Sequence, residues 1–130
     1  MVFGSNNLSN QQSVTGDRQA ALVSITEAVD HYRALTRANP AAHLSDLAGS
    51  LNNLSNQQSG TGDWQAALAS ITEAVEIRRT LAQANPAAHL PDLAMSRNTH
   101  SITQSGTGDW LAALVSITEA VDVRRALARA

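Results

Sequence analysis

Hydrophobic and small residues recur every three or four positions in two neighbouring stretches near the middle of the chain. In residues 46–59 this stripe is formed by Leu47, Ala48, Leu51, Leu54 and Ser55. A second stripe, about 20 residues long, begins at Trp64 and is formed by Ala67, Leu68, Ile71, Ala74, Val75 and Leu81. Spacing of three to four residues places side chains on one face of an α-helix. The pattern therefore predicts two consecutive amphipathic helices.

The residues that flank these stripes predict where the helices begin and end. The first helix is expected to stop at Gly60-Thr61-Gly62, because glycine readily takes the left-handed conformation that ends a helix. Asp63 then fits an N-cap, since its carboxylate can accept free backbone N–H groups of the next helix. Asn85-Pro86 is expected to end the second helix, and Pro91 suits the first turn of the following one. The unit is thus a helical hairpin with a linking turn.

This hairpin recurs along the chain with a period of 46 residues. Three strings return at that offset: NNLSNQQS at 6–13 and 52–59, NPAAHL at 39–44 and 85–90, and SITEAV at 24, 70 and 116. Residues 5–48 and 51–94 share 33 identities in 44 positions. We therefore expect one domain, residues 1–130, made of repeat 1 (about 3–44), repeat 2 (about 45–90) and repeat 3 (about 91–130).

The composition indicates that the hairpins stack on one another. Hydrophobic residues make up 43% of the 130 residues, but 23 of them are alanine and only four residues are aromatic. A single hairpin with so few large side chains cannot bury its apolar face alone. In a solenoid each repeat covers its neighbour, and alanine lets helix axes approach closely while favouring helix formation. The expected fold is all-α, with six helices in three stacked hairpins.

Charge and residue usage exclude several classes of function. The chain has no cysteine, so disulfides and thiolate sites are excluded. A net charge of −2 leaves no basic surplus for a nucleic-acid backbone. No apolar run is long enough for a membrane span or a secretory signal. We therefore expect a soluble, cytoplasmic protein that binds neither nucleic acid nor membrane.

The second copy resembles a tetratricopeptide repeat. Leu51 and Leu54 stand at the large apolar positions of the family's first helix and Ser55 at its small one. Gly62-Asp63-Trp64 matches the turn that opens the second helix, and the small, large, small packing triplet is Ala67, Ile71 and Ala74. The departures are Gln58, where an aromatic residue is usual, and the period of 46 in place of 34. Longer periods occur in kinesin-light-chain-like bacterial repeats, with the additional residues placed in the second helix and the linker, residues 78–90.

The resemblance implies a right-handed superhelix whose first helices line a concave face that holds a peptide or a partner helix. The chain would then be a protein-interaction scaffold and not an enzyme, with no cofactor. On the exposed face of the first helices the candidate peptide-binding residues are Asn6, Asn7, Asn10, Asn52, Asn53, Asn56, Asn98, Thr99 and Ile102. Side-chain amides carry donors and an acceptor that can pair with a peptide main chain. The alternative is that they hydrogen-bond between repeats, in a structural or self-associating segment of a larger regulatory protein.

Other candidate sites have ordinary explanations. Trp64 and Trp110 open second helices, where we expect them in the core; the alternative is an exposed anchor for a partner. His43 and His89 lie one repeat apart without further nearby metal ligands. No serine, histidine and aspartate group as nucleophile, base and orienting residue. Arginines that follow an acidic residue by three positions, at 33, 79 and 125, are expected to form weak solvated pairs within the second helices.

Two features of the sequence interrupt the regular stack. No polar capping element is evident at either end, so we expect self-association, as a homodimer or a larger assembly, or a place in a longer array. In the third copy Arg97 and His100 replace the leucines at 51 and 54 on the buried stripe. Because an unpaired buried arginine is costly, that helix is expected to rotate, fray or leave its hairpin, or else Arg97 extends to water along an open end.

Overall fold

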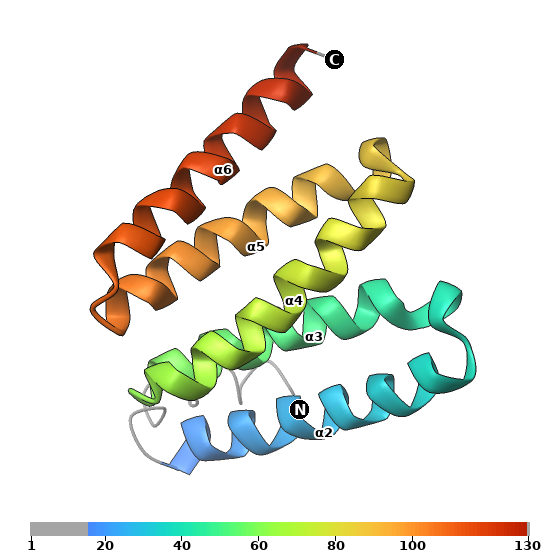
Figure 1. The fold of residues 1–130 in the computed structure, drawn as a ribbon. Helices are drawn as coiled ribbons and strands as arrows, with labels where there is room; N and C mark the ends of the chain where they lie inside the picture. The colour runs from blue at the N-terminus through green and yellow to red at the C-terminus, as the bar shows by residue number, and fades with distance from the viewer. Residues whose placement is uncertain (1–15, 130) are drawn as a thin grey trace, which may run out of the picture.

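The computed structural model describes residues 16–129, which form five α-helices and no strand (Figure 1). The helices are α2 (Gly16–Ala38), α3 (Pro40–Gly60), α4 (Trp64–Ala84), α5 (Pro86–Gly106) and α6 (Trp110–Arg129). The all-α prediction is confirmed. The first of the six predicted helices falls in residues 1–15, which lie outside the described residues.

Each helix packs against the next one in the sequence, so the helices form a stack with α2 and α6 at opposite ends (Figure 1). The first helices of repeats 2 and 3, α3 and α5, also contact each other. The backbones of the second helices α2, α4 and α6 do not come into contact with one another. The described hairpins therefore stack in sequence order, with α3 and α5 closer together than the second helices are.

The turn between the two helices of a hairpin has the predicted chemistry. α3 ends at Gly60, and Gly62 takes a left-handed conformation with φ of 85°. The Asp63 carboxylate then accepts the Ala66 backbone N–H at 3.1 Å and caps α4. The third copy repeats this turn: Gly108 has φ of 88°, and Asp109 accepts the N–H of Ala112 at 3.0 Å. The predicted stop and N-cap are confirmed.

The predicted linker is wrong, because a single residue, Asn85, separates α4 from α5. α5 begins at Pro86, whose fixed φ and missing N–H suit the first position of a helix. Pro91 consequently lies inside α5 and not in its first turn. There its ring nitrogen cannot donate to the carbonyl four residues earlier, a loss confined to one bond near the helix start. The additional residues of the 46-residue period thus lengthen both helices and not the connection.

The core is thin and depends on small residues. The large side chains that are almost fully buried include Leu51, Ile71 and Val75, each at most 2% exposed. Alanines at helix contacts are similarly buried: Ala48, Ala67, Ala74, Ala94, Ala113 and Ala120. Since a methyl group lets helix axes approach closely, much of the contact between helices is made by small side chains.

Two serine hydrogen bonds hold the helices of each hairpin together, and they recur one period apart. Ser55 Oγ donates to the Ala67 carbonyl at 2.8 Å, and Ser101 Oγ donates to that of Ala113 at the same distance. Ser70 Oγ donates to Gln58 Oε1 at 2.8 Å, and in the third copy Ser116 donates to Gln104 at 2.6 Å. Gln58 and Gln104 thus accept equivalent hydrogen bonds across their hairpins.

None of the five described helices combines the length and the hydropathy of a membrane span.

Candidate functional site

The predicted asparagines divide between exposed and buried positions. On α3, Asn53 and Asn56 are exposed, whereas Asn52 is 5% exposed. On α5, Asn98 and Thr99 are half-buried and Ile102 is 57% exposed. The remaining candidates, Asn6, Asn7 and Asn10, lie outside the described residues.

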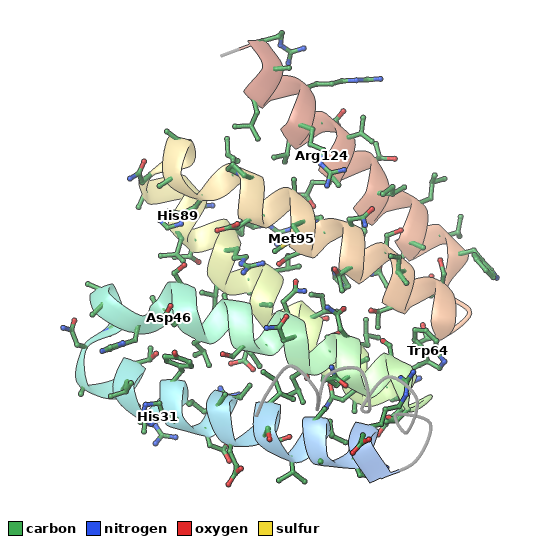
Figure 2. All side chains as sticks on the ribbon, turned by 180° about the vertical axis from the view of Figure 1, so that it is seen from behind. His31, Asp46, Trp64, His89, Met95 and Arg124 are labelled. Atoms are coloured by element: carbon green, nitrogen blue, oxygen red, sulfur yellow. The ribbon has the colours of Figure 1, made fainter. Side chains whose placement is uncertain are left out.

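The exposed members lie on the first helices of repeats 2 and 3: Asn53 and Asn56 on α3, and Ile102 on α5. Asn56 of α3 and Ile102 of α5 are separated by one period of 46 residues, as are Gly49 and Met95. Met95, labelled on α5 in Figure 2, is 45% exposed. In the sequence it precedes Ile102 by seven residues, which is two helical turns. We call the surface formed by Asn53, Asn56, Met95, Asn98 and Ile102 the α3–α5 face. It combines amide groups on both helices with apolar side chains on α5.

Asn52 belongs to a buried hydrogen-bond network between repeats. Ser96 Oγ on α5 donates to Asn52 Oδ1 on α3 at 2.9 Å. Arg78 on α4 donates from Nη1 to Ser96 Oγ at 2.5 Å and to the Asp92 carbonyl at 3.4 Å. The Arg78 side chain is buried, and burial lowers its pKa. Asn52 therefore forms a hydrogen bond between repeats, as predicted by the alternative that these asparagines hold the repeats together.

Asn52→Ala is expected to lower the free energy of unfolding by about 1–3 kcal/mol, because the Ser96 hydroxyl loses its acceptor inside the protein. Urea unfolding followed by circular dichroism measures this change. Asn53→Ala is the matched control, since the Asn53 side chain is exposed and its removal is expected to change stability by less than about 0.5 kcal/mol. Equal effects of the two substitutions would contradict the assignment of Asn52 to the network.

Sequence reasoning missed Arg78 and Ser96 as network residues. Serine stands at the same place in repeat 2, as Ser50, which was an available signal because both copies have a small polar residue there. No such signal existed for Arg78, since repeat 1 has Tyr32 at that position. Which side chain crosses from α4 to α5 depends on how the two hairpins are stacked, and that is a tertiary property.

Arg97 and His100 are buried as predicted, but the helix that carries them stays intact. α5 runs without interruption from Pro86 to Gly106 and packs against α6. Both residues are 8% exposed, so Arg97 does not extend to water. The expected fraying, rotation or exposure is wrong because Arg97 is not unpaired: it forms an ion pair with Glu119 of α6, which also pairs with Arg79 of α4 at 3.3 Å.

The surroundings of His100 favour its neutral form. Burial is the largest cause that lowers its pKa to about 4, followed by the positive charges of Arg97 and Arg79. His100 Nδ1 lies 3.4 Å from Arg97 Nη1, and Nε2 lies 3.4 Å from Thr72 Oγ1. Since a guanidinium can only donate, the arrangement suits a neutral ring that accepts at Nδ1 and donates from Nε2 to Thr72.

The arginines of the second helices pair with the next repeat and not within their own helix. Arg33 of α2 forms an ion pair with Glu73 of α4 at 2.7 Å, and this bond is the largest cause of a raised Arg33 pKa. One period later, Arg79 pairs with Glu119 of α6. The predicted pairing at three-residue spacing is therefore wrong for these two arginines. They lie on the side of their helix that faces the following hairpin, where a glutamate is within reach.

The two tryptophans have different environments. Trp64 is half-buried, and its ring lies against Gly106 at the end of α5, where an added Cβ would overlap it. Trp64 thus contacts the following hairpin. Trp110 is 69% exposed, so the prediction that it lies in the core is wrong. Among the described residues no glycine is positioned against Trp110 as Gly106 is against Trp64.

No group of three or more metal-ligating side chains occurs in residues 16–129. His43 and His89, the latter labelled in Figure 2, are both half-buried near the starts of α3 and α5. A groove of about 260 Å³ lies between α3 and α4, lined by Leu44, Glu76, Ile77 and Thr80. It offers one carboxylate and one hydroxyl, too few groups to position a reacting substrate.

No protein-family model, curated protein or solved structure matches the chain.

Proposed function

We propose that the chain is a protein-interaction scaffold that binds a peptide or an extended partner segment along the α3–α5 face. The observation that carries this proposal is the exposure of Asn53 and Asn56 beside the exposed apolar side chains of Met95 and Ile102. By resemblance to tetratricopeptide repeats, this side would be the concave face of a right-handed superhelix. The contact between α3 and α5 is in keeping with that curvature, because first helices lie closer together on an inner side.

The chemistry of the face fits an extended chain better than a charged ligand. Each asparagine amide can donate to a peptide carbonyl and accept a peptide N–H. Met95 offers a flexible apolar surface that adapts to different side chains. None of the five residues of the α3–α5 face is charged, so binding is expected to depend weakly on salt.

The test is a selection of peptides from a random phage library on the immobilised full chain, followed by affinity measurement on the chosen peptide. Asn53→Ala with Asn56→Ala is expected to weaken binding by about tenfold, the effect of losing about 1.4 kcal/mol. Gln65→Ala with Gln83→Ala is the control, because it removes two exposed amides from α4. A selection that yields no peptide, or peptides insensitive to Asn53 and Asn56, would overturn the proposal.

A second candidate is a structural segment that associates with copies of itself. Two observations favour it: Asn52 is used within the stack, and α6 exposes large apolar side chains at one end of the molecule. Sedimentation velocity separates the candidates. A scaffold that only binds peptides stays monomeric with or without the asparagines of the α3–α5 face, whereas a self-associating segment sediments faster as its concentration rises.

A further inference from the structure

The surface between α4 and the α5–α6 hairpin, here called the repeat 2–3 junction, holds a cluster of polar and charged side chains. Its members come from all three helices: Thr72 and Arg79 of α4, Arg97 and His100 of α5, and Glu119 of α6. The His100 ring contacts Arg97 in its own helix and Thr72 across the junction, each at 3.4 Å. Glu119 joins α6 to α4 and α5 through its pairs with Arg79 and Arg97. The cluster therefore spans the surface along which this hairpin meets α4.

The junction between repeats 1 and 2 has apolar side chains where this cluster has its buried polar ones. The equivalents of Arg97 and His100 are Leu51 and Leu54, which belong to the hydrophobic core. An ion pair between second helices is present at both junctions, so it does not distinguish them. His100 is also the one fully buried histidine of the described residues. Only the repeat 2–3 junction therefore buries, among the described residues, a histidine, whose charge can change at mildly acidic pH.

We propose that the repeat 2–3 junction is an acid-sensitive joint, at which protonation of His100 releases the α5–α6 hairpin from α4 while α2, α3 and α4 stay folded. In a stack of repeats, stability is close to a sum of contributions from each repeat and from contacts between neighbours. One junction can therefore open at a lower free energy than the whole chain requires. Opening brings the His100 ring into water, so a lower pH favours the open form.

The charges around His100 make the closed junction unfavourable for a proton. The positive charges that face the ring are Arg97 on α5 and Arg79 on α4, and Glu119 on α6 is the opposing carboxylate. The fourth helix in contact, α3, has only His43 and Asp46 as titratable residues, both in its first two turns. A protonated ring would thus place three positive charges against one carboxylate in a buried site.

The other hydrogen bonds decide that acid acts between the hairpins and not inside them. The serine bonds that hold each hairpin together join neutral groups, so they do not change with pH. The network of Ser96 with Asn52 and Arg78 also crosses the junction, but a hydroxyl, an amide and a guanidinium do not titrate at mildly acidic pH. Within this set of contacts, His100 is the group through which mild acid weakens the junction.

Trp64, labelled in Figure 2, reports on the junction, because its ring lies against Gly106 at the end of α5. The other tryptophan, Trp110, is 69% exposed, so Trp110→Phe leaves Trp64 as the single tryptophan with little effect on the fold. In this full-length variant, Trp64 fluorescence follows the contact between α4 and α5, while circular dichroism follows the helix content of the whole chain.

Urea unfolding of the Trp110→Phe variant at pH 7 and pH 5 tests the proposal with both signals. At pH 5, we expect Trp64 fluorescence to change in a first step and the remaining helices to unfold in a second one. The equilibrium constant of the first step is expected to rise about twentyfold from pH 7 to pH 5, because the open junction lets His100 bind a proton. His100 does not affect the second step, since its ring is already in water. At pH 7 the two signals are expected to lie closer together.

Replacing the histidine is expected to remove the acid response of the first step. His100→Leu in the Trp110→Phe background serves this purpose, and His31→Leu in the same background is the matched control, because His31 is exposed on α2. The control is expected to respond to acid as its parent does. Coincident loss of fluorescence and helix at pH 5 would overturn the proposal, since acid would then act on the whole chain. An acid response of the first step that persists without His100 would also overturn it. Neither result bears on peptide binding at the α3–α5 face.

Discussion

Replacing Arg97 and His100 together by leucine is expected to raise the free energy of unfolding by about 2 kcal/mol. Repeat 2 has leucine at both positions, and Leu51 and Leu54 are 2% and 8% exposed there. The substitutions therefore give repeat 3 a core that the fold already accommodates. Replacement of buried ion pairs by well-packed apolar residues is often neutral or stabilising by about 1–4 kcal/mol.

The expected gain in stability follows from the surroundings of Arg97 and from the second partner of Glu119. Burial lowers the pKa of Arg97, which shows that desolvation opposes its charge, and its buried Nε has no hydrogen-bond partner in the described part of the chain. Glu119 is not left alone when Arg97 is removed, because Arg79 still pairs with it, as Arg33 pairs with Glu73 in the preceding repeat. The usual penalty for breaking a buried pair, an orphaned charge, is thereby avoided.

Thermal and urea unfolding of the double variant measure the change. The control replaces an arginine and a histidine of α2, Arg37→Leu with His31→Leu, where both side chains are exposed. That control has the same composition as the test variant but is expected to change stability by less than about 0.5 kcal/mol. A lower melting temperature for Arg97→Leu with His100→Leu would refute the argument.

Acidification from pH 7 to pH 5 is expected to cost the protein about 2 kcal/mol of stability through His100 alone. The folded-state pKa of His100, about 4, lies below the ordinary histidine value of 6.5. Between these values the unfolded chain binds a proton that the folded chain does not, so stability falls as the pH is lowered from about 6.5 towards about 4. Above about pH 6.5 the ring is neutral in both states and contributes no further change.

The charges around His100 explain why the folded state resists protonation. Arg97 on the same helix and Arg79 on α4 face the ring, and Glu119 on α6 is the one carboxylate among the described residues that favours its protonation. A proton on Nδ1 would also remove the acceptor of the Arg97 hydrogen bond. The loss of stability is therefore a property of this buried cluster.

The measurement is urea unfolding of the unaltered chain and of His100→Leu at pH 7 and pH 5. The difference between the two proteins isolates the histidine, since all other residues are the same in both. His31→Leu, an exposed histidine on α2, is the control and is expected to keep the pH dependence of the unaltered chain. Should His100→Leu lose as much stability on acidification as the unaltered chain, His100 would not be the group responsible.

The local structure of the hairpin could be predicted because its signals lie within a few residues of one another. Gly62, Asp63 and Asn85 act on the backbone next to them, so the ends of α3 and α4 follow from the sequence alone. The start of α5 also had a local signal, because Asn85 precedes Pro86 and its side chain accepts the Ala88 N–H at 3.4 Å. Asn85 thus ends α4 and caps α5, and Pro91, five residues after Pro86, lies inside the helix.

The candidate site could be predicted only in part. The spacing of the asparagines indicates one helical face, but it does not separate Asn53, which is exposed, from Asn52, which bonds to Ser96 of the next repeat. That distinction depends on the angle at which the hairpins cross, to which many distant residues contribute. The ion-pair partner of Arg97 and Arg79 could not be predicted for the same reason, since Glu119 is far from either arginine in the sequence.

By itself, the sequence determined the repeat, its period of 46 residues and the helical hairpin, because periodicity and capping are encoded locally in the order of residues. Only the tertiary structure decided which polar side chains bond between repeats and which face water. It placed the arginines of one repeat against glutamates of the next and left Trp110, Leu114 and Val121 exposed on α6. The physical reason is that burial depends on which elements pack against a residue, so equivalent residues with the same local signals, such as Val75 and Val121, differ in exposure.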